Sequence, residues 1–335
     1  MKWPETTVTT AHGPRAAVAP YIISASRATD IPAFHARWFM ERLRAGYCLW
    51  ENPFNPRQKH YVSFEKCAAI VFWSKDPRPL LPWLSEIAAR GYQFYFQFTL
   101  NDYEAEGLEP GVPALDRRIA TFQELSDRIG RERVIWRFDP IILGGDLTVE
   151  RIAGRIHALA EQLSPYTEKF VFSFLDMYRK TAVRLRKIDP LLRPPTAEEA
   201  LRLIQALVRL NATLPAPLRL ATCAEQLEAA VPCVEHNSCI DPALLLRLCP
   251  ENPDIQRMCG GRICAEQGAL VALPPTGRRR RLKDDGQRAR CGCAPSKDIG
   301  SYSTCLHLCE YCYANGSRVR VTERVKAAVS GREQL

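Results

Sequence analysis

The sequence predicts an α/β protein built on a partial (β/α)6 barrel, TIM-like in type, with a cysteine-rich C-terminal extension. Three observations predict it: short apolar runs alternate with amphipathic helical stretches, polar residues recur along those runs, and cysteines gather late in the chain. Alternating strands and helices are typical of parallel sheets with right-handed crossovers. An open doubly wound sheet is the alternative, but no glycine-rich phosphate turn follows the first run.

The first two thirds of the chain contain the strand-like runs, each ending in a polar cluster. The runs are 20–30, 68–77, 92–102, 133–143, 169–178 and 218–228, and helical stretches include 33–46, 79–91, 115–130, 149–163 and 197–210. We expect residues 1–228 to form the barrel. Residues 229–335 are expected to form an extension packed on the barrel, which ends in a short helix and a frayed tail.

Polar residues occupy alternate positions in several runs. A parallel strand that is buried on both faces is normally apolar throughout. The polar positions therefore indicate side chains that reach the carboxyl-terminal mouth of a barrel, where such folds carry out their chemistry. These positions are Ser24, Gln97, Thr99, Arg137, Asp139 and Ser173.

Charged residues near the run ends are further candidates for binding a cofactor. Arg137 and Asp139 either pair with each other or bind a carboxylate and a ribose or amine. Asp30 either contributes to the site or caps a helix. The remaining candidates are Arg27, Lys75 and Lys297, of which the two lysines have ordinary loop charges as their alternative.

Composition places the chain among ordinary globular proteins, with 46% apolar and 25% charged residues. Residues 1–20 lack a signal-peptide core and no apolar stretch could span a bilayer, so we expect a cytoplasmic protein without a membrane partner. The net charge of +9 is compatible with an anionic partner. The run 277–290 is either a solvated basic loop or a contact to phosphate. No hydrolase motif is present.

Thirteen cysteines are many for a reducing compartment, where clustered thiols more often bind metal than form disulfides. Three of them, Cys305, Cys309 and Cys312, have the spacing C-x3-C-x2-C in CLHLCEYC. A turn can direct all three sulfurs to one point, which suits zinc or an iron–sulfur cluster. Zinc would need a fourth thiol, Cys291 or Cys293, whereas a four-iron cluster would keep one iron open.

The other cysteines have less specific spacing. Cys291 and Cys293 predict either packing thiols or an auxiliary cluster completed by one of two cysteine pairs. Those pairs are Cys259 with Cys264, and Cys233 with Cys239. Cys48 and Cys67 stand alone and are expected in the core, and His307 is expected at the surface.

The motif CLHLCEYC resembles the cluster motif of the radical S-adenosylmethionine enzymes, which use a partial (β/α)6 barrel. The chain also resembles the DUF1848 family, a domain of unknown function, over about residues 20 to 315. The phrases that carry this resemblance are SRATDIPAFHARWF, NPFNPRQ, VFWSKDP, FQFTLNDYE, WRFDPIIL, SFLDMY and SKDIGSYSTCLHLCEYCYAN. One departure is that the cysteine motif follows the sixth run rather than the first, which leaves the strand order open.

The resemblance implies that Cys305, Cys309 and Cys312 hold a [4Fe-4S] cluster whose fourth iron is chelated by S-adenosylmethionine. It further implies reductive cleavage of that cofactor, hydrogen-atom abstraction, and an external electron donor of flavodoxin or ferredoxin type. Tyr311 resembles the adenine-packing residue of these enzymes, with core packing as its alternative. The site-residue prediction is completed by Ser24, Arg27, Lys75, Gln97, Thr99, Arg137 and Asp139.

The sequence does not specify the substrate, although the basic balance favours an anionic one such as a nucleotide or nucleic acid. A second interpretation is a metal-binding module without catalytic activity. Such a module would hold a four-cysteine zinc site or a fully ligated cluster and dock nucleic acid through residues 278–281.

Overall fold

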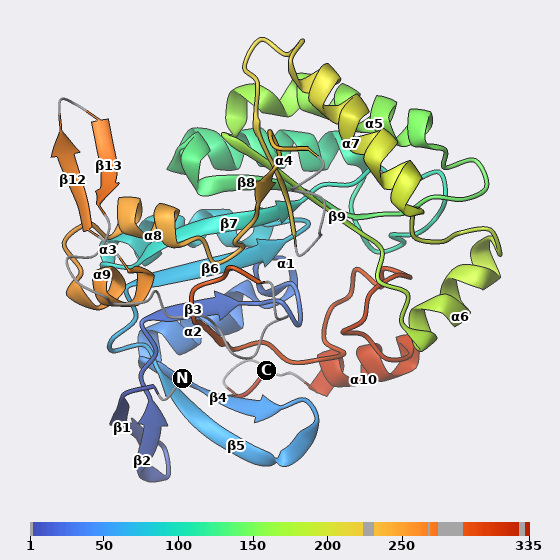
Figure 1. The fold of residues 1–335 in the computed structure, drawn as a ribbon. Coiled ribbons are helices and arrows are strands. Elements are labelled where there is room, and N and C mark those ends of the chain that lie inside the picture. Colours follow the sequence, from blue (N-terminus) through green and yellow to red (C-terminus); the bar gives the residue numbers. More distant parts are fainter. Residues whose placement is uncertain (1–2, 224–230, 261, 267–268, 274–290, 328–331) are drawn as a thin grey trace.

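The computed structural model describes residues 3–223, 231–260, 262–266, 269–273, 291–327 and 332–335 (Figure 1). Its main feature is an eight-stranded parallel sheet with the order β11-β10-β9-β8-β7-β6-β3-β14. The strands are β3 (Ile22–Ala25), β6 (Ala69–Ser74), β7 (Gln93–Thr99), β8 (Val134–Ile141), β9 (Lys169–Phe174), β10 (Arg219–Thr222), β11 (Glu235–His236) and β14 (Lys297–Asp298).

Each of the six predicted runs contains one strand of this sheet, and the six strands lie side by side in chain order. The α/β class is therefore confirmed. The two outermost strands, β11 and β14, both come from the part of the chain after residue 228. They do not pair with each other within the described residues, so the sheet is not a closed barrel there. The proposed division at residue 228 cuts across this one sheet.

Helices form where the sequence supplies amphipathic patterns and caps. Thr196 and Glu199 form a reciprocal capping box at the start of α7, and Thr148 caps α5. The helices of the first part are α1 (Ile31–Phe34), α2 (Ala36–Ala45), α3 (Leu84–Ala89), α4 (Leu115–Ile129), α5 (Val149–Leu163), α6 (Arg179–Ile188) and α7 (Ala197–Asn211). The later ones are α8 (Pro242–Leu248), α9 (Pro253–Cys259) and α10 (Arg318–Ala327), and three short 3-10 helices complete the set in the described ranges.

The main sheet is buried on both faces. Alternate residues of each strand point to opposite sides, so each strand contributes to two apolar clusters. In β6, Ile70 and Phe72 belong to the cluster that contains apolar residues of α4, α5 and α7. Ala69 and Val71 belong to a second cluster, with apolar residues of α8 and α9. Figure 1 shows α4, α5 and α7 together on one side of the sheet. We call the face covered by α8 and α9 the inner face.

A second sheet, which was not predicted from the sequence, lies beside the main one and has the order β1-β2-β5-β4. Its strands are β1 (Glu5–Thr10), β2 (Gly13–Val18), β4 (Tyr47–Asn52) and β5 (Asn55–Ser63). The C-terminal residues dock on it: the Leu49 amide donates to the Glu333 carbonyl at 2.8 Å, and Leu335 is buried. The prediction of a frayed tail is therefore wrong for residues 332–335.

The remaining strands, β12 (Arg262–Glu266) and β13 (Ala269–Leu273), form an antiparallel pair. The basic run 277–290, including residues 278–281, lies outside the described residues. In the described ranges, no helix combines the length and apolar composition needed to cross a bilayer.

Candidate functional site

A cavity of about 490 Å³ lies at the carboxyl edge of the main sheet. Its walls include residues at or just after the ends of β3, β6, β7, β8, β9 and β10, joined by the segment 291–314. Figure 1 shows this late segment beside the carboxyl ends of the first strands of the main sheet. Parallel α/β sheets bind their ligands at the carboxyl edge, so this cavity is the candidate functional site.

The predicted thiol trio lines this cavity. Cys309 lies close to Cys305 and Cys312. A negative charge on either of these two sulfurs would raise the pKa of Cys309. Burial is the largest cause of the raised pKa of the Cys309 and Cys305 thiols. A buried thiolate is stable only beside a compensating cation, so the trio suits a soft metal centre.

Buried polar contacts fix the loop that carries the trio. His307 is 2% exposed, and its Nε2 lies 2.8 Å from Asp30 Oδ2 while its Nδ1 lies 3.2 Å from the Gly111 carbonyl oxygen. The prediction of a surface role for His307 is therefore wrong. Asp30 also caps α1 through the Ala33 amide, as its alternative interpretation predicted. Leu308 has φ of 55°, a strained conformation for this residue type that the surrounding contacts maintain.

Tyr311 lines the cavity, and its hydroxyl is anchored inside the protein. This hydroxyl donates to Glu109 and accepts from Asn101 Nδ2 at 3.0 Å. Lys75 Nζ lies 2.8 Å from Glu109 Oε1, so the predicted Lys75 is part of a buried ion pair. Burial alone would raise the pKa of Glu109, but Lys75 and Arg118 overcome it and lower the pKa to about 2. These contacts favour an anchoring role for the tyrosine hydroxyl.

The charged wall of the cavity comes from β8 and its neighbours. Arg137 Nη2 lies 2.5 Å from Asp139 Oδ2, so these residues pair with each other while both line the cavity. The Ser173 hydroxyl donates to Asp139. The Trp73 ring has Arg27 Cζ at 5.2 Å and Arg137 Cζ at 5.5 Å from its centroid. This wall offers two guanidinium groups and an aromatic ring to a ligand.

Three predicted candidates do not line the cavity. Ser24 bonds Asp298 at 2.8 Å behind the wall, and Gln97 donates to the Cys239 carbonyl at 2.8 Å. Lys297 lies 3.2 Å from the centroid of the Trp50 ring, where burial lowers its pKa to about 8. Thr99, by contrast, is in the lining.

A second group of thiols lines the same cavity: Cys223, Cys239, Cys291 and Cys293. Of the four cysteines predicted from the sequence as partners of Cys291 and Cys293, only Cys239 is in this lining. Cys233 is exposed, Cys259 is buried at the end of α9, and the side chain of Cys264 lies outside the described residues. Cys223 was not predicted. Its position two residues after the inner-face residue Ala221 of β10 would have placed it on the same face. Cys48 and Cys67 are buried core residues, as expected.

The donor chemistry of the cavity fits a soft metal centre. In the described part of the chain, no three or more His, Cys, Asp or Glu side chains are arranged to hold a metal ion as they stand. Thiolates around a single zinc ion lie about 4 Å apart, because each Zn–S bond is about 2.3 Å long. A cavity of about 490 Å³ lined by thiols has room for an iron–sulfur cluster as well as for a single ion.

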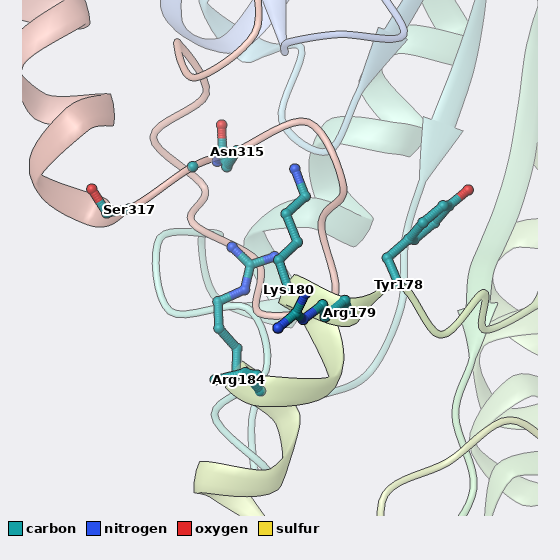
Figure 2. A pocket seen from close by; sticks show the side chains of 8 residues that line it. Tyr178, Arg179, Lys180, Arg184, Asn315 and Ser317 are labelled. Carbon is teal, nitrogen blue, oxygen red and sulfur yellow. The ribbon is translucent and has the colours of Figure 1, made fainter.

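A second cavity, of about 710 Å³, adjoins the loop that follows the trio. Figure 2 shows Lys180 and Arg184 of α6 facing the chain at Asn315 and Ser317, while Tyr178 points away. Arg184 also donates to the Cys312 carbonyl. The side chains give this cavity a basic wall next to the thiol loop.

Comparison with known proteins gives one match. The family model described as a domain of unknown function (DUF1848) matches residues 22–314. The chain belongs to the DUF1848 family. The DUF1848 match spans both thiol groups and all the strand ends that line the cavity. Neither a curated protein nor a solved structure matches the chain.

Proposed function

We propose that this DUF1848 protein is a radical S-adenosylmethionine enzyme in which Cys305, Cys309 and Cys312 hold a [4Fe-4S] cluster. The observation that carries the proposal is that three closely spaced thiols share one cavity with the polar ends of the parallel strands. Protein acceptors already occupy both ring nitrogens of His307, which lies between the thiols. The Glu310 carboxylate of the same loop is paired with Arg318 at 2.6 Å. One iron would therefore stay open to an external ligand.

The strand order supports the same proposal. Six strands in chain order resemble the partial (β/α)6 barrel of the radical S-adenosylmethionine enzymes. The late position of the motif then has a physical reason. β14 pairs in parallel with β3, the first barrel strand, and the thiol loop follows β14. The loop thus reaches the cavity beside the end of β3, near where an early motif would lie.

When bound, the cluster supplies the electron that cleaves the sulfonium of S-adenosylmethionine. The residues of this chain would bind and orient that cofactor. Arg27 and Arg137 offer positive charge to its carboxylate, and Trp73 offers a ring to its adenine. Asp139 and Thr99 offer oxygens to its amine or ribose. Tyr311 holds the thiol loop against Glu109 and supplies ring surface.

We also propose an anionic substrate, which could be a nucleotide or nucleic acid, and an external electron donor of flavodoxin or ferredoxin type. Support for the anionic substrate comes from the net charge of +9 and from Lys180 and Arg184 beside the thiol loop. The seven cysteines that line the cavity are free thiols, which supports work in a reducing compartment such as the cytoplasm.

Anaerobic purification followed by reduction with dithionite tests the proposal. The protein should contain about four irons or more per chain and convert S-adenosylmethionine to 5′-deoxyadenosine. Cys309→Ala should lose the iron of this cluster and abolish cleavage, while the core variant Cys67→Ala retains both. A colourless protein with about one zinc per chain would instead support the metal-binding module. Full cleavage by Cys309→Ala would refute the ligand assignment.

A further inference from the structure

We propose that single-stranded nucleic acid binds in the groove between α6 and the start of α10, with its bases stacked on a row of aromatic rings. This row ends at the cavity that both thiol groups line, which we call the thiol cavity. The proposal names the anionic substrate of the proposed function and, as a substrate assignment, rests on that function. Figure 1 shows α6 and α10 next to each other at the edge of the molecule.

The groove is formed by two adjoining cavities. They have volumes of about 710 Å³ and 250 Å³, and both are lined by Arg184 and the segment 315–317. At one end, Tyr178 lines both the groove and the thiol cavity, so the groove continues into the proposed active site. The other wall is one face of α6, because residues three, four, seven and eight positions apart lie on the same side of a helix. This face consists of Lys180, Val183, Arg184, Lys187 and Ile188.

Most of the positive charge in the groove is unpaired. Arg179, Lys180 and Lys187 are exposed, and within the described residues none of them has an ion-pair partner. Of the described residues in the two linings, Glu310 alone is acidic, and it pairs with Arg318 at 2.6 Å. Lys180 and Lys187 are about 10 Å apart along the helix, which exceeds the spacing of two successive phosphates on one strand. The groove therefore offers a polyanion several cations without a competing carboxylate.

This surface also concentrates the charge of the whole chain. Residues 176–191 and 302–327 contain nine Lys and Arg against four Asp and Glu, a net charge of +5 out of the total of +9. The field of such a cluster attracts anions and speeds their association. A strand of nucleic acid, with one phosphate per nucleotide, is a ligand of matching charge.

Four aromatic rings form a chain of contacts at the end of the groove. Tyr178 and Tyr313 are 44% and 41% exposed, have ring centroids 6.0 Å apart, and both line the thiol cavity. Tyr302 lies 6.2 Å from Tyr313, and Phe54, which is 84% exposed, lies 5.9 Å from Tyr302. The Tyr313 hydroxyl donates to the Arg27 carbonyl at 3.2 Å, which holds this ring in place. Exposed rings beside a basic groove are the surface on which unpaired bases stack.

These features favour a single strand over a duplex or an acidic protein. In a duplex the bases are stacked on one another and paired, so their faces do not meet the rings. A single strand places its phosphates against the α6 wall and its bases on the rings at the same time. An acidic protein matches the charge, but it does not account for a row of rings that leads to the thiol cavity.

Fluorescence anisotropy on the full chain, purified without oxygen, tests the proposal. The probe is a fluorescein-labelled strand of about 15 nucleotides, as DNA and as RNA, and the duplex of the same sequence is the comparison. We expect a strand to bind at least about tenfold more tightly than its duplex, with an affinity that falls as salt rises. Equal or tighter binding of the duplexes, or no binding of either strand, would overturn the proposal.

Removal of two groove cations tests the α6 wall. Lys180→Ala/Lys187→Ala should weaken strand binding about tenfold and reduce the slope of log affinity against log salt by about one. The matched control Lys66→Ala/Arg209→Ala removes two exposed cations that lie elsewhere and should bind like the unmodified chain. Equal affinity of these two variants would show that the strand does not lie in the groove.

A second pair of variants tests the rings. Tyr178→Ala/Tyr313→Ala should weaken binding about tenfold, whereas Tyr178→Phe/Tyr313→Phe keeps the ring faces and should bind like the unmodified chain. Polyglutamate, which carries the charge of an acidic protein but no bases, should displace the strand at least about tenfold less well than an unlabelled strand. Full affinity without the rings, or equal competition by polyglutamate, would leave a general site for acidic chains and refute base stacking.

Photo-cross-linking of a strand that contains 4-thiothymidine locates the site on the unmodified chain. Cross-links should map to residues 177–191 and 313–319, and cross-links confined to 277–290 would overturn the assignment to the groove. Cleavage of S-adenosylmethionine by the reduced protein is measured in parallel. Strand binding without formation of 5′-deoxyadenosine would refute the proposed function and leave the groove as a binding site, whereas cleavage without strand binding would refute the groove alone.

Discussion

The two thiol groups of the cavity differ in how the chain assembles them. Cys305, Cys309 and Cys312 lie within eight residues on one loop, which is held from behind by the Asp30–His307 and Lys75–Glu109 contacts. The second group is collected from positions as far apart as Cys223 and Cys293 and is bonded by donors that belong to the sheet face, such as Arg137. A local motif therefore needs a rigid support, whereas a dispersed group needs a correctly formed sheet.

The groups also differ in number, which has a chemical consequence. Three thiols leave a coordination position for an external molecule, and four thiols leave none. The first group shares the cavity lining with Arg27, Trp73 and Asp139, which could orient a cofactor. Changes to the support of the first group, with the second group left intact, separate the roles of the two groups.

The largest effect is expected from Gly111→Ala. A Cβ at this position would lie 2.2 Å from the Leu306 carbonyl oxygen and 2.9 Å from that of His307, so the thiol loop must move. We expect loss of most S-adenosylmethionine cleavage and of about four irons, with about 1–3 kcal/mol lower stability. Iron analysis, activity assays and urea unfolding measure these losses.

The matched control is Gly154→Ala in the middle of α5, where no atom lies within 4 Å of the added Cβ. This variant should keep its iron and gain up to about 1 kcal/mol, because alanine favours a helix over glycine. Full iron content and activity in Gly111→Ala would show that the loop does not need its present position.

His307→Ala should have the next largest effect. It removes a buried partner of Asp30 and of the Gly111 carbonyl, and we expect a loss of about 2–4 kcal/mol in the free energy of unfolding. The first group should lose its iron. His12→Ala, at an exposed turn, is the control. Equal stability of the two variants would contradict the anchoring role.

The Glu109 carboxylate should make stability depend on pH in the acid range. Its pKa of about 2 lies below the ordinary 4.5, so its contribution is complete above about pH 4.5 and is lost as pH falls through about 2. The contribution at pH 7 is on the order of 3 kcal/mol. Urea unfolding of wild type and Glu109→Gln should converge between pH 4.5 and pH 2. A constant difference over that range would contradict the assignment.

The smallest effect is expected from Tyr311→Phe. The change removes one buried hydroxyl that bonds Glu109 and Asn101 but keeps the ring, and it should cost about 1–2 kcal/mol. The iron content should stay the same, and so should the KM for S-adenosylmethionine. An increased KM in Tyr311→Phe, seen in steady-state assays, would show that the hydroxyl itself contacts the cofactor.

The sequence by itself determined the elements whose causes are local. Each of the six strand runs contains one strand of the main sheet because alternation of apolar runs and amphipathic helices is a short-range pattern. The first thiol group has one spacing within one loop, so it too was visible. The polar positions Thr99, Arg137 and Asp139 were found through the period of two along a strand, and they line the cavity.

Tertiary structure alone decided the rest. His307 looked like a surface residue because its partners, Asp30 and Gly111, lie far away in the chain and become neighbours only when the late segment adds β14 beside β3. The same step brings Cys291 and Cys293 to Cys223 and Cys239. Periodicity reports which face a residue occupies, but it carries no information about which distant segments pair. That choice depends on burial of the whole inner face, which no short stretch of sequence encodes.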